Sequence, residues 1–214
     1  SGEVFDGNFI INEMLKDKTK TTFLDNINDF NSNVKINIDK TFIEQDYYFT
    51  KLNGNIKFKN NVINNLDLVA DFHDNKKFSL SIKKNKNNEK ITTLFSEYAK
   101  PLVKKYKFIK GFEEGILDFY SVKKNNISNS HIKIYDFKLK ELPVLTKILT
   151  LASLQGIADL LTGEGIRFNE FEMNFKNEKN LMTIDEIYAI GPAISILMEG
   201  YVEKDRLISL RGTL

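Results

Sequence analysis

The feature that most constrains the fold is an alternation of apolar and polar residues that recurs along most of the chain. Val34, Ile36 and Ile38 alternate with polar residues, and residues 49–59 repeat the pattern. Successive side chains of a strand lie on opposite faces, so a period of two indicates strands that are apolar on one face. Turn signals such as Asn60-Asn61 separate these segments. The pattern predicts a meander of antiparallel hairpins with one apolar and one polar face.

We therefore expect a mainly β (α+β) fold, in which a long curved antiparallel meander sheet forms an apolar groove. Residues 52–82 and 166–201 each show the pattern of three strands joined by turns, a weak internal repeat that favours an elongated sheet. The expected strands are residues 34–38, 49–59, 66–72, 78–82, 91–95, 116–122, 131–139, 168–175, 181–188, 194–201 and 207–214.

Two segments have helical patterns instead. Residues 96–107 predict one helix, with Ser96 as its N-cap. Residues 143–162 predict a two-helix segment that begins at Pro143, because proline suits the first turn of a helix. These helices would cover only part of a sheet of about eleven strands. The uncovered apolar surface would then mark a binding site.

Composition excludes several classes of function. The 214 residues contain no cysteine, which excludes disulfides, thiol nucleophiles and zinc–thiolate sites. The 31 basic and 29 acidic residues give a net charge of +2, too balanced for charge-driven binding of nucleic acid. No stretch reaches the roughly 18–20 apolar residues that span a bilayer.

The domain organisation is expected to be simple. Residues 1–30 are weakly patterned and predict a weakly structured lead-in to one β-groove domain over residues 31–214. The chain begins with Ser1-Gly2 and no initiating Met, so we expect a segment of a longer protein.

No catalytic set of residues is recognisable. The two histidines, His73 and His131, are far apart in the sequence, and no GxSxG nucleophile motif accompanies them. Neighbouring carboxylates such as Glu113-Glu114 would lie on opposite faces of a strand. We therefore expect no enzyme activity, no metal and no cofactor.

Lysines cluster around the first expected helix. They are either a solvated face or a contact for anionic lipid headgroups. The cluster consists of Lys100, Lys104, Lys105, Lys107 and Lys110.

The C-terminal part of the chain resembles the C-terminal region of AsmA-like proteins, especially the YhdP-like members of the AsmA/TamB group. The resemblance covers residues 88–214 well and residues 30–85 loosely. It is carried by Asp136-Phe137-Lys138-Leu139, Leu142-Pro143-Val144-Leu145, Leu149, Leu151-Ala152-Ser153-Leu154, Gly156, Leu160-Leu161, Gly163-Glu164-Gly165-Ile166-Arg167-Phe168, Met182-Thr183-Ile184, Gly191-Pro192-Ala193, Glu199-Gly200 and Leu210-Arg211-Gly212-Thr213.

The resemblance implies a protein of the periplasm, anchored to the inner membrane by an N-terminal helix that this sequence lacks. Members of the group form long β-grooves with apolar interiors and are implicated in moving phospholipid toward the outer membrane. The resemblance supplies no catalytic residues, and the protein partners stay open.

Two hypotheses follow. In the first, the chain is a segment of a bridge-like lipid carrier that holds phospholipid acyl chains in its groove, and residues 143–162 cap the groove or touch a membrane. In the alternative, it is a non-catalytic structural or assembly module of the envelope that acts through protein–protein contacts, including strand addition. The residues expected to bind lipid are Ile56, Phe58, Leu66, Leu68, Phe78, Leu80, Phe137, Leu139, Phe171, Met173, Phe175, Ile194, Ile196 and Met198.

Overall fold

The structure, a computed structural model, is mainly β, as the alternation predicts. The chain divides into two compact units, residues 1–95 and residues 96–214, whereas the sequence predicts a lead-in over residues 1–30 and one domain over residues 31–214. Residues 143–162 and His73 lie outside the described residues. The structure describes residues 2–6, 31–44, 46–60, 62–72, 74–104, 111–140, 165–192, 194–203 and 207–213.

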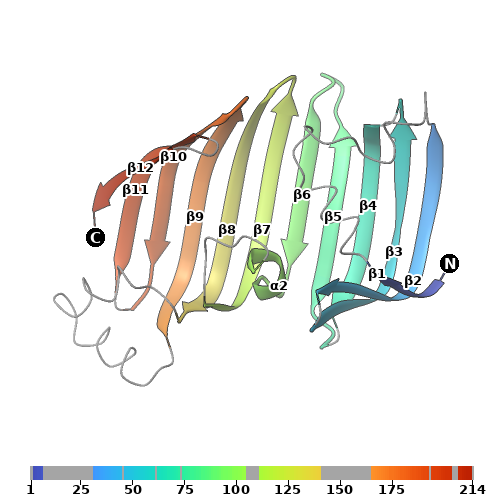
Figure 1. Ribbon diagram of the computed structural model, residues 1–214, viewed down its shortest axis with the longest axis horizontal. Coiled ribbons are helices and arrows are strands. Elements are labelled where there is room, and N and C mark those ends of the chain that lie inside the picture. Colours follow the sequence, from blue (N-terminus) through green and yellow to red (C-terminus); the bar gives the residue numbers. More distant parts are fainter. Residues whose placement is uncertain are drawn as a thin grey trace. The chain divides into compact units, whose positions relative to one another are not determined.

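The strands of the first unit lie side by side in sequence order (Figure 1). Strands β2 to β5 pair antiparallel, as hairpins must, and β1 pairs parallel to β2. β1 lies inside the expected lead-in and is not predicted by the alternation, because its pairing depends on residues about 36 positions away and not on a local pattern. The strands are β1 (Gly2–Asp6), β2 (Ser32–Glu44), β3 (Tyr47–Lys59), β4 (Val62–Phe72), β5 (Lys77–Lys84) and β6 (Lys90–Ser96).

The apolar positions of these strands share one face, as predicted. The register places Ile56 opposite Leu66, and Leu66 opposite Ile82. These three side chains are buried, and Leu66 has no exposed surface. Partly buried hydrophobic side chains pack against them, namely Ile36, Phe58, Ile63, Leu68 and Leu80. The opposite face is polar, with ion pairs such as Lys83–Asp67 (3.0 Å).

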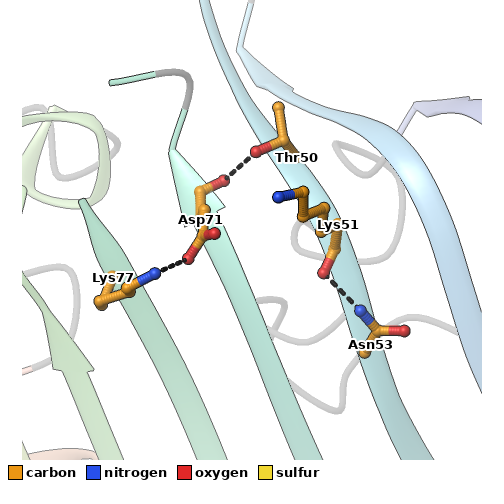
Figure 2. Close-up of polar contacts among 5 residues, drawn as sticks. All are labelled: Thr50, Lys51, Asn53, Asp71 and Lys77. Carbon is orange, nitrogen blue, oxygen red and sulfur yellow. Dashed lines mark hydrogen bonds and ion pairs between the residues drawn. The ribbon is translucent and has the colours of Figure 1, made fainter. Parts of the chain in front are cut away.

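An irregularity in β3 changes which residues point to the core. Lys51 has a φ of 52°, and the register between β3 and β4 shifts there. The Asn53 side-chain amide donates to the Lys51 carbonyl over 2.7 Å, which stabilises the turned backbone (Figure 2). Thr50 donates to the Asp71 carbonyl, and the Asp71 carboxylate pairs with Lys77 at 2.8 Å (Figure 2). These contacts link β3 to β4 and β4 to β5 beside the irregularity.

The second unit is another antiparallel meander in sequence order (Figure 1). Its strands pair antiparallel with their neighbours from β7 to β12. The strands are β7 (Phe112–Lys124), β8 (Ile127–Leu139), β9 (Ile166–Glu178), β10 (Leu181–Ile190), β11 (Ser195–Glu203) and β12 (Leu207–Thr213).

The alternation of inward and outward side chains is interrupted in β7 and β8, and we call such an interruption a reset. Glu114, Gly115 and Asp136 all have positive φ, at 65°, 84° and 51°. As a result Phe137 lies on the same face as Ile134, three residues away, and both are buried. Gly115 suits this site because a Cβ there would lie 3.2 Å from three neighbouring side-chain atoms in an unfavourable backbone conformation.

The predicted helix over residues 96–107 is much shorter within the described residues, where α2 runs from Lys100 to Val103. The prediction of Ser96 as its N-cap is wrong. Ser96 ends β6, and its hydroxyl both accepts from the Tyr98 N–H and donates to the Tyr98 carbonyl. That local turn occupies the hydroxyl, so the helix begins after Ala99, with proline in its first turn.

Truncation of a buried and of an exposed residue on β4 should separate the two faces of the first unit. Leu66→Ala should lower the free energy of unfolding by about 2–5 kcal/mol, because it leaves a cavity in the core. Val69→Ala, at a side chain 57% exposed on the same strand, should change it by less than about 0.5 kcal/mol. Urea denaturation followed by circular dichroism measures both. Equal losses would contradict the assigned faces.

Candidate functional site

An extended apolar surface in the second unit consists of side-chain rows that run across the strands. Residues directly opposite each other in neighbouring strands share a face, so the register shows which side chains meet. Three rows cross from β7 to β11 on one face. The Leu117 row is Leu117, Ile134, Phe171, Ala189 and Ile196; the Phe119 row is Phe119, Ile132, Met173, Ile187 and Met198; the Ser121 row is Ser121, Ser130, Phe175, Ile184 and Gly200.

These rows differ in how far they are covered. Leu117, Ile134 and Ile196 in the first row are at most 7% exposed. In the Phe119 row, only Ile187 is buried, and the side chains on the strands β7 to β9 are partly exposed. The Phe119 row therefore keeps apolar surface in contact with solvent. This surface is available to an apolar ligand, and its burial would be favourable.

Aromatic rings form one end of this face. Phe137 stacks on Phe112 and on Phe168, with ring centroids 5.2 Å apart in both pairs. Phe171 meets Phe137 edge-on at 6.5 Å, which joins the stack to the Leu117 row. Offset stacking and edge contacts are the favourable ring geometries. The stack gives this end of the face a rigid floor, because Phe112, Phe137 and Phe168 are all buried.

The predicted lipid-binding residues fall into two sets, one in each unit. The first set lies on the apolar face of β3 to β5, where most of its members belong to the core described above; it is Ile56, Phe58, Leu66, Leu68, Phe78 and Leu80. The second set lies in β8, β9 and β11; it is Phe137, Leu139, Phe171, Met173, Phe175, Ile196 and Met198. Ile194 lies before β11, where its carbonyl accepts from the Gly191 N–H.

Sequence reasoning missed the part of the face that comes from β7 and β10, and also Ile132 and Ile134 of β8. Leu117 and Phe119 alternate as a half-buried strand requires, so this signal was present in the sequence. Ile132 and Ile134 were harder to assign, because the reset at Asp136 gives them the opposite parity from Phe137. Ile184 and Ile187 straddle a register shift in β10 and are likewise three residues apart.

The opposite face of the same strands is charged. Glu172 lies between two partners on β8: His131 Nε2 at 2.9 Å and Lys133 Nζ at 2.8 Å. Lys133 also approaches Glu170, at 3.6 Å. The hydrogen bond from Lys133 lowers the pKa of Glu172, with a smaller contribution from His131, and the same bond raises the pKa of Lys133. These charged groups pair with one another, so we interpret this face as a solvated ion-pair ladder.

The described residues offer little for other chemistry. No group of three or more side chains in the described ranges could hold a metal ion. Of the lysines near α2 that the structure describes, Lys100 pairs with Glu113 and Lys104 is exposed. The structure describes no helix that is both long and apolar enough to cross a membrane.

Comparison of the chain with protein-family models, with curated proteins and with solved structures finds no match. The likeness to AsmA-like proteins therefore rests on the sequence motifs alone.

The ion-pair ladder predicts a specific dependence of stability on pH. Because the folded-state pKa of Glu172 is lowered, its contribution to stability is present above its ordinary pKa of 4.5 and is lost as the pH falls through the lower folded value. Glu172→Gln should therefore reduce the loss of unfolding free energy below about pH 4.5. Glu186→Gln, at an exposed carboxylate on β10, is the matched control. Urea denaturation across this pH range would contradict the assignment if the two variants behaved alike.

Proposed function

We propose that this chain is a lipid-binding segment that holds phospholipid acyl chains on the apolar face of β7 to β11. The observation that carries the proposal is the Phe119 row, a line of apolar side chains that is continuous across five strands yet only partly covered. A core row is covered along its length. A partly covered row provides surface for a ligand of the same length and polarity.

The dimensions of the row suit an acyl chain. Neighbouring strands lie about 4.8 Å apart, so a row over five strands extends about 19 Å. Half of the roughly 30 Å hydrocarbon core of a bilayer, the share of one leaflet, is about 15 Å. Each buried methylene contributes about 0.8 kcal/mol, so contact along the row would hold a chain without specific polar bonds.

The wider setting comes from the resemblance to AsmA-like proteins. In this proposal the sheet is curved into a groove, and the chain is part of a bridge-like protein of the periplasm, anchored in the inner membrane. Acyl chains then move along the groove between the inner and outer membranes while headgroups face solvent. No step of this process requires an enzyme activity or a cofactor.

The alternative, an envelope module that acts through protein–protein contacts, is favoured by one observation. Large hydrophobic side chains are exposed on the last three strands at Leu181, Leu197, Tyr201 and Leu210. Leu210 belongs to β12, the last strand in the order of the second unit, so a partner strand that paired there would cover it.

Native mass spectrometry of the purified chain, with lipid extraction alongside, distinguishes the two functions. The lipid proposal predicts co-purifying phospholipid or stoichiometric uptake of added phospholipid. A mass without lipid, together with no uptake, would overturn it and favour the protein-binding module.

A carboxylate placed in the Phe119 row should weaken lipid uptake. Met173→Asp puts a charge where an acyl chain would lie, and burying that charge is costly, so uptake of a fluorescent phospholipid should weaken at least tenfold. Asn174→Asp adds a carboxylate to the same strand on the opposite face, next to His131 in the register, and should leave uptake unchanged. Met173 is a better probe than Ile196, because Ile196 is buried and a charge there would disturb folding. Equal uptake by both variants would contradict the assigned face.

A further inference from the structure

A fourth row closes the apolar face at the hairpin end of β7, β8 and β9. Lys123 lies opposite Ser128, and Ser128 lies opposite Asn177, one step beyond the Ser121 row. Alternation is unbroken from Leu117 to Lys123, so these polar residues share the face of the Phe119 row. The row continues as apolar Met182 and Val202 on β10 and β11. Polar groups are therefore concentrated at one corner of an otherwise apolar surface.

The side chains that β7 contributes to this face become more polar toward the hairpin, in the same order as the parts of a phospholipid. Leu117 and Phe119 are apolar, Ser121 carries a hydroxyl and Lys123 carries an ammonium group. Each step of two residues advances about 7 Å along the strand. An acyl chain, an ester linkage and a phosphate follow one another in the same order in a glycerophospholipid.

The serine pair in the third row has spare hydrogen-bonding capacity. Ser121 Oγ and Ser130 Oγ are 2.9 Å apart, and both side chains are buried in the apolar face. The bond between them uses one of their two hydroxyl hydrogens, so the other remains able to donate to an ester or phosphate oxygen. The pair is thus a polar step between the apolar rows and Lys123.

The charge at this corner complements a phosphate. The residues of the third and fourth rows include no carboxylate, and Lys123 is exposed. Lys179, in the exposed turn after β9, adds a second positive charge, and the carboxylate of its neighbour Glu178 pairs with Lys176 at 3.1 Å. Lysine, serine and asparagine are donors suited to phosphate oxygens.

We propose that this corner is a headgroup site for glycerophospholipid: Lys123, Ser128 and Asn177 bind the phosphate, and the Ser121–Ser130 pair faces the ester region. The acyl chain then lies along the Phe119 row, so this inference rests on the proposed function. It gives the ligand a fixed direction on the sheet, with its headgroup at the hairpin end of β7 to β9 and its chain across the strands toward β11. The site favours anionic phospholipid, because a headgroup amine would oppose the lysines.

Charge reversal at two adjacent lysines tests the site. Lys123→Glu should weaken binding of fluorescent phosphatidylglycerol about fivefold to tenfold, because it replaces a donor to phosphate by a repelling carboxylate. Lys124→Glu is the matched control, since it makes the same change in net charge on the opposite face of the same hairpin. Binding of diacylglycerol with the same acyl chains, which lacks the phosphate, should be the same for both variants and for the unmodified chain.

The outcomes separate the two proposals. Loss of phosphatidylglycerol binding in Lys123→Glu alone, with diacylglycerol binding retained, supports the headgroup site. Equal loss in both variants would show general charge attraction and overturn it, as would unchanged binding in both, while the apolar face would still stand. If the unmodified chain bound neither lipid, both the site and the proposed function would be overturned. Circular dichroism of each variant confirms that the fold is retained.

Discussion

Cross-strand register is the constraint on which the rest of this structure depends. A strand of this chain has one apolar face, and that face is useful only if its neighbours present theirs on the same side. The pairings of the second unit do this across five strands, so Leu117 on β7 and Ile196 on β11 belong to one row although each touches only its neighbours. A slip of one residue in any pairing would interrupt the rows at that strand. Both the core and the proposed lipid surface come from the same register.

The two faces of the sheet have different roles in holding that register. On the apolar face, burial favours any arrangement that keeps hydrophobic side chains together. On the charged face, Lys133 and His131 both meet Glu172, and such contacts form only when β8 and β9 are aligned as they are. Partly exposed ion pairs contribute little stability. Opposite charges in facing positions nevertheless select between registers, since a slipped strand would no longer place each charge next to a group of opposite charge.

The sequence alone predicted the period-two strands and the mainly β class, because both depend on local alternation. It could not show the resets at Lys51 and Asp136, where positive φ values move the apolar side chains to the other parity. For this reason the alternation predicts Phe137 as a site residue but not Ile132 or Ile134, which share its face. Ser96 was assigned to a helix because serine is a frequent N-cap, but its hydroxyl forms a local turn instead. The polar corner at Lys123, Ser128 and Asn177 joins residues from three strands, so it appears only once the register is known.

The sequential strand order also has a consequence for how the chain reaches this structure. Nearly all neighbouring strands in the second unit are joined by short connections, so their paired residues are close in sequence. Folding is fast when contacts are close in sequence. The exception is β8 with β9, whose partners Leu139 and Ile166 are separated by a long connection. Closing that loop has an extra entropic cost, so this step should be the slowest in assembling the sheet. During synthesis, the β7–β8 hairpin of this unit would form first, with the edge of β8 still unpaired. The apolar rows would extend beyond β8 only after β9 had been synthesised and had paired with it.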